Sequence, residues 1–398
     1  MSRLVLLHPV AADDPQLPAA LAAALRGGRP VAVLPAEAAA RERFLAVLAP
    51  EVPVGADVGV VVATSGSTGE PKAVVLPVSA LQASVAATAA RLGGPGSWTL
   101  TLPASSVAGL MVLVRAVVGG GALRRLSSDL SDPALAPEGD GPHFLSVVPT
   151  QLHRVADDPA AVERLARYDT VLVGGAAAED GLLERFRAGG VRLVTTYGMS
   201  ETCGGCVYDG RPLDGVQVSV DPADQRITLT TPTAFAGYHR RPELTREVLT
   251  GPGRVRTADR GRLDGGRLTV LGRVDDVVVS GGTNVDLARV ERLVRAALGS
   301  EQVAVTARPD AEWGARVVLV LTADGPAPTL ADVRELLRPR VEPAALPTEV
   351  LRLPTLPLLP GGKLDRLSLR RAAADVPATT DPTTSATTTG PALPEGPR

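Results

Sequence analysis

The run from Thr64 to Lys72 has the composition of a phosphate-binding loop: Thr-Ser-Gly-Ser-Thr-Gly-Glu-Pro-Lys. It follows an apolar, β-branched run, Gly59 to Val62, which predicts a buried strand. Glycines let backbone N–H groups approach an anion closely, hydroxyls donate further hydrogen bonds, and Lys72 adds a cation. The run is not a Walker A loop, because Pro71 precedes the lysine and Ala73 follows it. We therefore expect it to bind phosphate groups, with a polar turn that binds no ligand as the alternative.

Later segments carry residue types that suit the rest of a nucleotide. Val173-Gly174-Gly175-Ala176 ends a predicted strand, where backbone without large side chains can stack on a base. Tyr197 offers a flat face for a base, and Glu201 is a hard oxygen ligand of the kind that Mg²⁺ takes beside substrate phosphates. Asp259 can accept both hydroxyls of a ribose, and Lys363 is a lysine on a glycine-rich segment near the C-terminus.

Each of these residues also has an ordinary explanation when it is taken alone. Glu201 can be a carboxylate at a helix start, Asp259 a turn former, and Lys363 a solvated loop charge. Arg273, in the segment Gly272-Arg273-Val274-Asp275-Asp276, can be a surface ion pair. Their occurrence together and in order favours the chemical interpretation.

The elements that must position these residues follow an alternating pattern. Short β segments are predicted at 4–7, 31–34, 58–62, 144–148, 170–173 and 192–195, and helices at 18–25, 41–48, 79–92, 149–156 and 161–166. This alternation predicts an α/β fold with mostly parallel strands. Residues 217–231 and 267–271 instead predict antiparallel strands, and hence a β-rich subdomain that closes the first domain.

A domain boundary is predicted near residue 272. We expect a large N-terminal α/β domain over 1–272, a hinge over 273–276 that contains Asp275, and a small mobile C-terminal α+β domain over 277–375. In the second domain, Asp286 has the character of an N-cap for a helix that Gly299 ends. The segment 376–398 is rich in Thr and Pro and is expected to be a disordered tail.

Composition limits the class of protein. The chain has 398 residues, 45% of them hydrophobic and 21% charged, which is ordinary for a globular protein and is long enough for two domains. The formal charge of −2 gives no electrostatic reason to expect nucleic acid or an anionic membrane as a partner. The start of the chain has no long apolar region of a signal peptide, and the run 107–123 predicts a buried helix and no membrane insertion. We expect a cytoplasmic protein.

Two cysteines, Cys203 and Cys206, form a Cys-Gly-Gly-Cys segment. Such spacing occurs in redox pairs and in half of a zinc site. The chain has no second cysteine pair, and its four histidines are scattered without metal-ligand spacing. We therefore favour two small residues that line a glycine-rich loop.

Taken in order from residue 58 to 366, these motifs resemble those of the adenylate-forming superfamily of acyl-CoA synthetases and adenylation domains. The resemblance implies the two-domain adenylate-forming fold, with Lys363, Glu201 and Thr64 as catalytic residues, Glu201 as the magnesium ligand and Asp275 as the hinge. It implies that ATP and AMP are bound by Thr64, Ser65, Gly66, Ser67, Thr68, Gly69, Lys72, Gly174, Gly175, Ala176, Thr196, Tyr197, Gly198, Met199, Ser200, Asp259 and Arg273.

The chemistry that this resemblance implies has two steps. A substrate carboxylate attacks the α-phosphorus of ATP, which gives an acyl-adenylate and pyrophosphate, and a thiol then displaces AMP. Positioning and charge neutralisation carry the first step, because both reactants are negatively charged. In the resembled superfamily the small domain swings about the hinge between the steps and withdraws the residue that matches Lys363.

Segments between the motifs indicate the acid. Residues 102–110, 197–210 and 279–285 look like those of o-succinylbenzoate–CoA ligases of menaquinone biosynthesis, in their short actinobacterial form. This implies ATP and Mg²⁺ as cofactors and CoA as a co-substrate. It also implies that the partners are small molecules and that the protein is a monomer or homodimer. It implies an acyl pocket that includes Ser105, Ser106, Gly109, Arg115, Thr202 and Cys203.

Arg115 lies near where that family has an arginine for the substrate's aromatic carboxylate, and an arginine snorkelling from a helix is the alternative. The chain departs from the family at Ser105 and Ser106, where histidines are common, which affects the details of the acyl pocket. It also has Ala258, Val279 and Gly361 where glycine, lysine and serine are usual. None of these departures removes a group that the chemistry requires.

Two other functions stay open at this point. One is an acyl-CoA ligase or a stand-alone adenylation enzyme for another aryl or small acid. The other is a non-catalytic adenylate-binding protein, which would bind nucleotide without releasing pyrophosphate.

Overall fold

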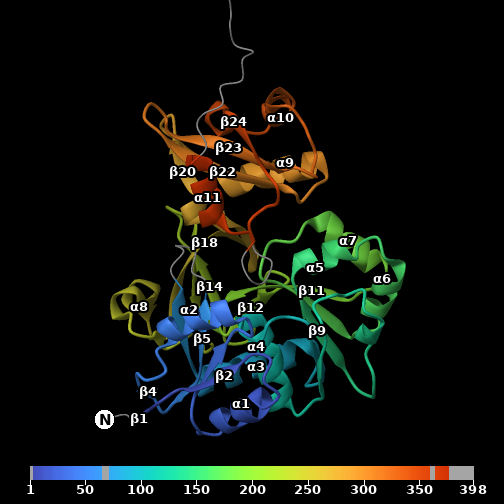
Figure 1. Ribbon diagram of the computed structural model, residues 1–398, viewed down its shortest axis with the longest axis vertical. Helices are drawn as coiled ribbons and strands as arrows, with labels where there is room; N and C mark the ends of the chain where they lie inside the picture. The colour runs from blue at the N-terminus through green and yellow to red at the C-terminus, as the bar shows by residue number, and fades with distance from the viewer. Residues whose placement is uncertain (1–2, 65–70, 359–363, 376–398) are drawn as a thin grey trace, which may run out of the picture. The chain divides into compact units, whose positions relative to one another are not determined.

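The computed structural model describes residues 3–64, 71–358 and 364–375 of the chain, which divides into two compact units (Figure 1). Unit 1 comprises Met1–Asp276 and Pro357–Leu367, and unit 2 comprises Val277–Leu356 and Ser368–Arg398. Each unit has a hydrophobic core of its own.

The first sheet of unit 1 contains the strand that leads into the predicted phosphate loop. Its strand order is β16-β6-β5-β3-β2, with β2, β3 and β5 parallel and with β6 antiparallel to both β5 and β16. The strands are β2 (His8–Ala11), β3 (Val31–Leu34), β5 (Val58–Thr64), β6 (Lys72–Pro77) and β16 (Gly237–Tyr238).

Helices cover both faces of this sheet, which explains why its central strands are apolar at every position. Val60 and Val62 face a core that includes residues of α1 (Leu17–Leu25) and α3 (Val78–Leu92). Val61 and Ala63 face a second core, with α2 (Ala38–Leu48). Strand alternation thus sorts one apolar run onto two buried faces.

The second sheet of unit 1 has the order β13-β12-β11-β10-β9-β7-β8. Strands β8, β7, β9, β10 and β11 are parallel, while β12 and β13 are antiparallel additions. They are β7 (Ser97–Leu100), β8 (Leu123–Arg125), β9 (His143–Val147), β10 (Thr170–Val173), β11 (Leu193–Met199), β12 (Gly204–Tyr208) and β13 (Arg211–Pro212).

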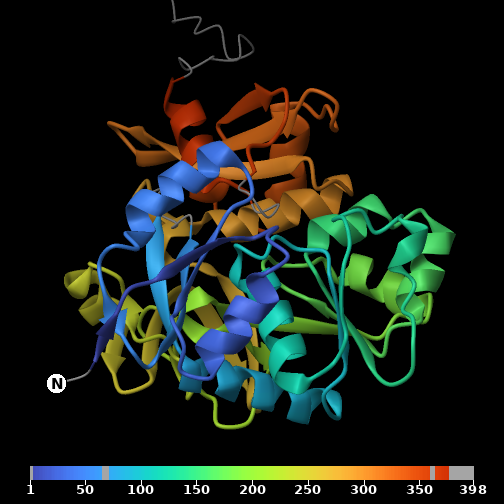
Figure 2. The same cartoon turned by 60° about the horizontal axis from the view of Figure 1, so that its bottom comes forward.

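Helix α4 (Val107–Gly119) contributes to the core on one face of the second sheet, with α1 and α3. Helices α5 (Pro149–Arg154), α6 (Pro159–Ala166) and α7 (Asp180–Ala188) pack in a separate core on the other face, and Figure 2 shows them in green at one side of unit 1. The carboxyl ends of β9, β10 and β11 therefore lie along one edge of a sheet that is covered on both faces.

The rest of unit 1 is mainly antiparallel. A third sheet has the order β14-β15-β18-β17, and β19 also pairs with β18. Its strands are β14 (Gln217–Val220), β15 (Arg226–Thr230), β17 (Leu249–Gly251), β18 (Arg254–Asp264) and β19 (Arg267–Arg273). The remaining elements are β1 (Leu4–Val5), which pairs with β4 (Val54–Gly55), α8 (Pro242–Val248), and the 3-10 turns η1 (Pro133–Leu135), η2 (Ser200–Thr202) and η3 (Val274–Asp276).

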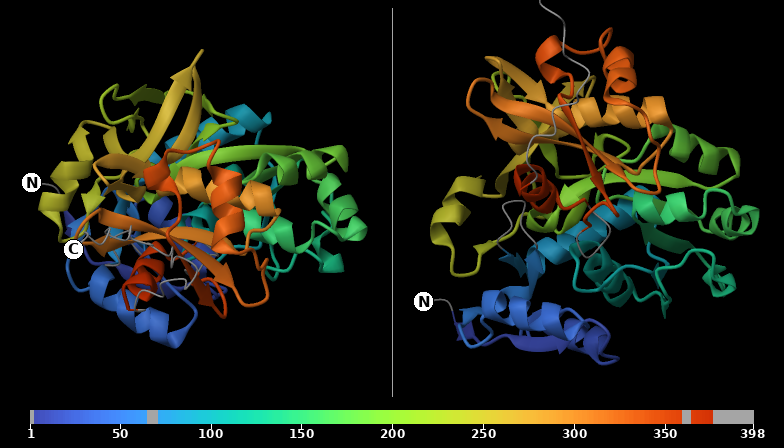
Figure 3. Two further views of the ribbon diagram at one scale, coloured as in Figure 1. Left: turned by 90° about the horizontal axis from the view of Figure 1, so that it is seen from above. Right: turned by 45° about the horizontal axis from the view of Figure 1, so that its top comes forward.

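Unit 2 is a small α+β body, drawn in orange and red in Figure 3. Helix α9 (Leu287–Leu298) packs on a sheet in which β22 (Val303–Asp310) and β23 (Gly314–Thr322) are antiparallel and β24 (Glu349–Leu353) is parallel to β23. A hairpin of β20 (Val277–Ser280) and β21 (Thr283–Asp286) precedes α9. Helix α10 (Leu330–Leu337), turn η4 (Pro343–Ala345) and helix α11 (Arg366–Asp375) follow.

The predicted α/β architecture is confirmed, and so are the two antiparallel regions at 217–231 and 267–271. Asp286 is the N-cap of α9 and accepts a hydrogen bond from the Arg289 N–H, and Gly299 ends the helix in the left-handed conformation. Within the run at 107–123, residues Val107–Gly119 form the largely buried helix α4, while Leu123 begins β8. No helix in the described ranges combines the length and the apolar composition that crossing a bilayer requires.

One predicted strand is displaced. Of the strand expected at 4–7, only Leu4 and Val5 form a strand, β1, which is not part of the five-stranded sheet. The strand that joins this sheet is β2, which contains Pro9. A proline is tolerated there because β2 is an edge strand, and its missing N–H costs no ladder hydrogen bond.

Candidate active site

The phosphate-loop segment begins and ends on neighbouring strands. Thr64, the last residue of β5, lies opposite Lys72, the first residue of β6, in the antiparallel register. Both are half-buried. Ser65, Gly66, Ser67, Thr68 and Gly69 lie outside the described residues. Since the two strands pair up to this point, the hydroxyl of Thr64 and the cation of Lys72 stand at one end of the first sheet.

A second group of predicted residues lies where β10 and β11 end side by side. These strands pair in parallel, with Val173 opposite Thr195, so that Gly174 to Ala176 follow β10 beside Thr196. A Cβ on Gly174 would overlap the Thr196 Oγ1, and Gly175 has φ +85°, which favours glycine. Gly175 and Ala176 are exposed, which leaves backbone available to a ligand.

Gly198 and Met199 complete β11, and a close approach of two backbones sets the position of Gly198. A Cβ there would overlap the carbonyl oxygen of Gly204 on β12, so glycine is required. The register of β11 against β12 shifts between Tyr197 and Gly198, as in a β-bulge. Such a shift re-aims the side chains at the strand end.

Tyr197, Asp259 and Arg273 form one hydrogen-bonded group, although 62 residues separate the first two. The Tyr197 hydroxyl donates to Asp259 Oδ2 at 2.9 Å, and Arg273 Nη1 donates to Asp259 Oδ1 at 3.2 Å. Arg273 Nη2 also donates to Asp275 Oδ2 at 2.8 Å. Asp259 and Arg273 are cross-strand partners in β18 and β19, which explains their contact.

The electrostatics of this group fix its protonation. Burial and the neighbouring Asp259 charge raise the pKa of Tyr197, so the phenol stays a hydrogen-bond donor. Burial opposes the charge of Arg273, but its hydrogen bond to Asp275 and the charge of Asp259 outweigh burial and raise its pKa. Each oxygen of Asp259 accepts one of these hydrogen bonds and keeps a lone pair. Asp259 can therefore still accept the hydroxyls of a ribose.

The turn that carries Glu201 is held by backbone hydrogen bonds. Ser200–Thr202 form η2 directly after β11. Thr202 Oγ1 accepts from the Met199 N–H at 3.0 Å, and Phe235 N–H donates to the Glu201 carbonyl at 2.9 Å. Cys203 has φ +50°, and Ser84 on α3 donates to its carbonyl at 3.1 Å. These contacts fix the direction in which the Glu201 side chain leaves the turn.

The Glu201 carboxylate suits a magnesium ion that is bound mainly through substrate phosphates. The Tyr238 hydroxyl donates to its Oε1 at 2.6 Å, and Glu201 is only half-buried. A carboxylate has about four lone-pair sites, so this hydrogen bond, the one that the described residues make to the carboxylate, leaves Oε2 available as a hard oxygen ligand. Mg²⁺ keeps several waters and takes one or two carboxylates beside phosphates. Glu201 fits that requirement.

Three of the predicted acyl-pocket residues, Ser105, Ser106 and Gly109, lie at the start of α4. Ser106 is the N-cap: its Oγ accepts from the Gly109 N–H at 3.3 Å and donates to the Pro103 carbonyl at 2.8 Å. Ser105 is half-buried beside it. A Cβ on Gly109 would overlap the carbonyl oxygen of Pro103, so the chain passes close to the first helical turn.

Arg115 is buried in α4, and no carboxylate of the described residues pairs with it. It is 6% exposed, its Nε has no hydrogen-bond partner, and its guanidinium lies 5.1 Å from the centre of the Trp98 ring. It lies one helical turn beyond Met111, which approaches Gly204 on β12. No ion pair of Arg115 with a carboxylate occurs within the described ranges. A buried guanidinium without an anion is costly, and an anionic ligand would remove that cost.

The two cysteines are structural. Cys203 and Cys206 are free and buried, and burial raises the pKa of Cys203 and raises that of Cys206 to about 12. A thiol with so high a pKa is a poor nucleophile and a poor metal ligand at neutral pH.

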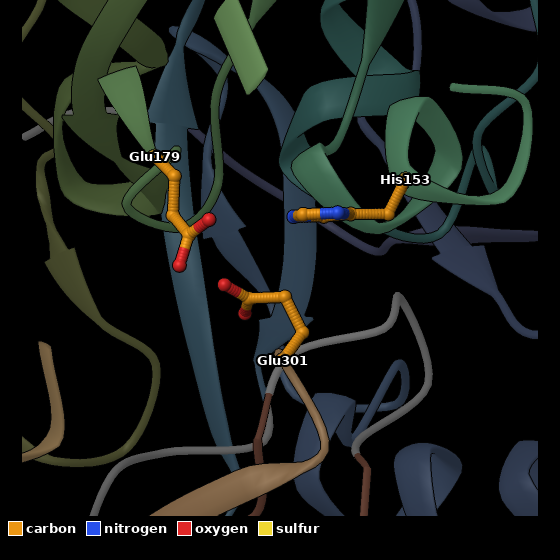
Figure 4. Close-up of side chains that lie close together, drawn as sticks. All are labelled: His153, Glu179 and Glu301. Carbon is orange, nitrogen blue, oxygen red and sulfur yellow. The ribbon is translucent and has the colours of Figure 1, made fainter. Parts of the chain in front are cut away.

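Figure 4 shows the side chains of His153, Glu179 and Glu301. His153 lies in α5 and Glu179 precedes α7, both in unit 1, whereas Glu301 belongs to unit 2, where it accepts from Arg295 at 2.6 Å. Because these residues belong to two units, they define no metal site.

Three aromatic residues were not predicted as part of the site: Tyr238, Phe235 and Trp98. The sequence did contain a signal for Phe235 and Tyr238. Aromatic residues make up only 3% of the chain, so two of them close together in the polar stretch after β15 are unusual. Lys363 and the loop residues 65–69 lie outside the described residues, so their assigned roles stay predictions.

Comparison with known proteins gives the family. A model of AMP-binding enzymes matches residues 5–234, and a model of the AMP-binding enzyme C-terminal domain matches residues 289–363. A probable 2-succinylbenzoate–CoA ligase of Mycobacterium tuberculosis is 41% identical over 333 residues, which cover 80% of this chain and 85% of that protein.

Solved structures of other proteins are also similar to this chain. E. coli MenE with bound OSB-AMS is 29% identical with a TM-score of 0.67, covering 80% of this chain and 69% of that one. The o-succinylbenzoate coenzyme A synthetase of Bacillus subtilis, in complex with ATP and magnesium ion, shares the fold at 21% identity, with a TM-score of 0.75 and coverage of 91% and 88%. This chain belongs to the AMP-binding enzyme family, and its relative at 41% identity is described as a probable 2-succinylbenzoate–CoA ligase.

Proposed function

We propose that this protein is a Mg·ATP-dependent ligase that converts o-succinylbenzoate and CoA into o-succinylbenzoyl-CoA through an acyl-adenylate, with release of pyrophosphate and AMP. This activity is a step of menaquinone biosynthesis. The observation that carries the choice of acid is the 41% identity to a probable 2-succinylbenzoate–CoA ligase over most of both chains. The site in unit 1 supports adenylation, because it gathers a free carboxylate oxygen, a cation and a ribose-type acceptor.

In the first step, an oxygen of the succinyl carboxylate attacks the α-phosphorus of ATP. A new P–O bond forms, the bond to the β-phosphate oxygen breaks, and pyrophosphate leaves with the electron pair. Both reactants are anions, so the site must supply positive charge and alignment. Lys72 would contact the phosphates beside Thr64, and Asp259 would hold the ribose. Mg²⁺ on Glu201 would offset the charge of the triphosphate when bound.

In the second step, the sulfur of CoA attacks the acyl carbon of the adenylate. A thioester bond forms and the bond from that carbon to the phosphate oxygen breaks, so AMP leaves. The acyl-adenylate is a mixed anhydride with a good leaving group, and the chain need not supply a nucleophile of its own. The buried cysteines, with their raised pKa values, are consistent with that.

Arg115 is our candidate for the group that recognises the ring carboxylate of o-succinylbenzoate. Its burial without a counter-ion in the described part of the chain supports this assignment. A guanidinium binds a carboxylate strongly in such surroundings, because both groups are shielded from water. We also propose that the enzyme works in the cytoplasm as a monomer or homodimer, without nucleic-acid partners.

The first experiment measures pyrophosphate release from ATP and Mg²⁺ with o-succinylbenzoate and with a panel of aryl and small acids, each with and without CoA. We expect selective release with o-succinylbenzoate, and the CoA thioester by mass spectrometry when CoA is present. Preference for another acid would keep the adenylation chemistry and overturn the substrate. Binding of ATP with no release from any acid would indicate a non-catalytic nucleotide-binding protein.

A further inference from the structure

Tyr238 stands next to two residues of opposite charge in unit 1. Strand β16 pairs antiparallel with β6, which places Tyr238 opposite Val74, two residues from Lys72. The side chain of Tyr238 is 6% exposed. Phe235 packs against its ring edge to face, with ring centres 4.9 Å apart. The tyrosine is therefore held in one orientation by strand pairing and by aromatic packing.

The hydroxyl of Tyr238 points to Glu201. Its hydrogen bond to Glu201 Oε1, at 2.6 Å, has the short length of an O–H donor on a charged carboxylate. The backbone of Glu201 is held independently, through its carbonyl, by Phe235 N–H. Both ends of Glu201 are thus oriented from the segment that carries Tyr238.

The ring of Tyr238 faces Lys72. The ammonium Nζ lies 5.5 Å from the ring centre, within the range of a cation–π contact. Within residues 3–64, 71–358 and 364–375, Lys72 makes no ion pair with a carboxylate. A π face attracts the cation without neutralising it and without occupying its N–H donors.

We propose that Tyr238 is a positioning residue that keeps Lys72 and Glu201 from pairing with each other. A direct ion pair would neutralise the cation and occupy the carboxylate. The tyrosine instead takes one lone pair of Glu201 through its hydroxyl and holds Lys72 through its ring. The ammonium then stays available for phosphate, and Oε2 of Glu201 stays available for Mg²⁺. The inference rests on the proposed function, because that function gives Lys72 and Glu201 these roles.

The two halves of Tyr238 can be separated by substitution. Tyr238→Phe keeps the ring and removes the hydroxyl, whereas Tyr238→Leu removes both contacts. The control is Tyr168→Phe, which also removes a buried tyrosine hydroxyl, one that donates to the Leu135 carbonyl at 2.5 Å in a different core of unit 1.

The measurement is calorimetric binding of ATP to the full chain, without acid or CoA, once with Mg²⁺ and once with a chelator. Tyr238→Phe should weaken Mg·ATP binding by about tenfold, the effect of one charge-assisted hydrogen bond, and leave metal-free ATP binding unchanged. Tyr238→Leu should weaken both by about tenfold or more, because Lys72 is then free to pair with Glu201. Tyr168→Phe should change neither.

Kinetics give a second readout. In pyrophosphate release, Tyr238→Phe should raise the KM for Mg²⁺ more than it lowers kcat. In the binding assay, the loss of Mg·ATP affinity that Tyr238→Phe causes should disappear when Glu201→Gln is already present. Equal losses of Mg·ATP and metal-free ATP binding, or the same loss in the Tyr168→Phe control, would overturn the inference. An undiminished effect of Tyr238→Phe beside Glu201→Gln would also overturn it. Failure of the proposed function is distinguished by the wild-type protein, which would then release no pyrophosphate.

Discussion

At the scale of single residues, Arg115 is the side chain whose buried surroundings most clearly favour an anionic ligand. It belongs to α4 and its guanidinium lies over the Trp98 ring, but its Nε has no hydrogen-bond partner among the described residues. The sequence left open whether this arginine snorkels to the surface. The structure excludes that alternative, because the residue is 6% exposed.

We predict that Arg115→Met raises the KM for o-succinylbenzoate by about 10- to 100-fold, the loss of hydrogen bonds to a charged carboxylate. The kcat should change little, because the reacting carboxylate is the other one. The test compares this acid with an analogue that lacks the ring carboxylate, for which wild type and variant should have the same KM. Arg91→Met is the matched control, since Arg91 donates to the Tyr208 and Pro212 carbonyls. Equal losses with both acids would contradict the assignment.

At the scale of elements, two helical glycines have opposite surroundings. A Cβ on Gly109 in α4 would overlap the Pro103 carbonyl oxygen and lie 2.9 Å from that of Leu102. A Cβ on Gly181 in α7 would meet nothing within 4 Å. Helix propensity favours alanine at both positions by about 1 kcal/mol, so any difference between them reports the clash.

We therefore predict that Gly181→Ala stabilises the protein by up to about 1 kcal/mol, whereas Gly109→Ala destabilises it by about 1–3 kcal/mol. Gly109→Ala should also weaken binding of the acid, because the clash displaces the Ser106 cap from Gly109. Denaturant unfolding followed by circular dichroism measures both shifts. A shift of the same sign and size in the two variants would show that the first turn of α4 has room.

Elements with strong local signals could be predicted from the sequence. Helix α9 has its cap at Asp286 and its stop at Gly299, and β5 is a continuous apolar run. Strand β6 was missed, because Lys72 at its start belongs to the polar loop pattern and Pro77 ends the run. Local periodicity cannot show which strand a short apolar run will pair with.

In the site it is even clearer that local sequence patterns do not show which residues come together in space. Tyr197 and Asp259 were predicted from their chemistry and Arg273 from the family resemblance, but their shared hydrogen bonds depend on pairing between β18 and β19 and on the end of β11. Tyr238 was not predicted at all. Its role comes from the pairing of β16 with β6, which brings together residues far apart in the chain. Such contacts follow from topology, which a single sequence specifies only weakly.

At the scale of the whole molecule, the proposed reaction draws on both ends of the chain. The groups described above belong to unit 1, and Lys363, which lies outside the described residues, follows β24 in the sequence. The segment from Arg273 to Asp276 joins the two units in the chain, and Asp275 accepts a hydrogen bond from Arg273 there. We propose that this segment is the hinge and that Lys363 serves only the first step. A few residues between domains can absorb the change in backbone angles that such a division requires.

We predict that Lys363→Ala abolishes adenylation and spares thioester formation. The lysine would offset negative charge as the carboxylate attacks the α-phosphate, and loss of one such group costs about 100- to 1,000-fold in rate. The second step has a neutral acyl carbon as its target, so its rate from supplied o-succinylbenzoyl-adenylate should stay within about threefold of wild type, because no interaction made in that transition state is removed. Pyrophosphate release and single-turnover thioester formation measure the two steps separately. An equal loss in both would mean that Lys363 supports the fold or the binding of the adenylate, and the division of labour between the two steps would have to be given up.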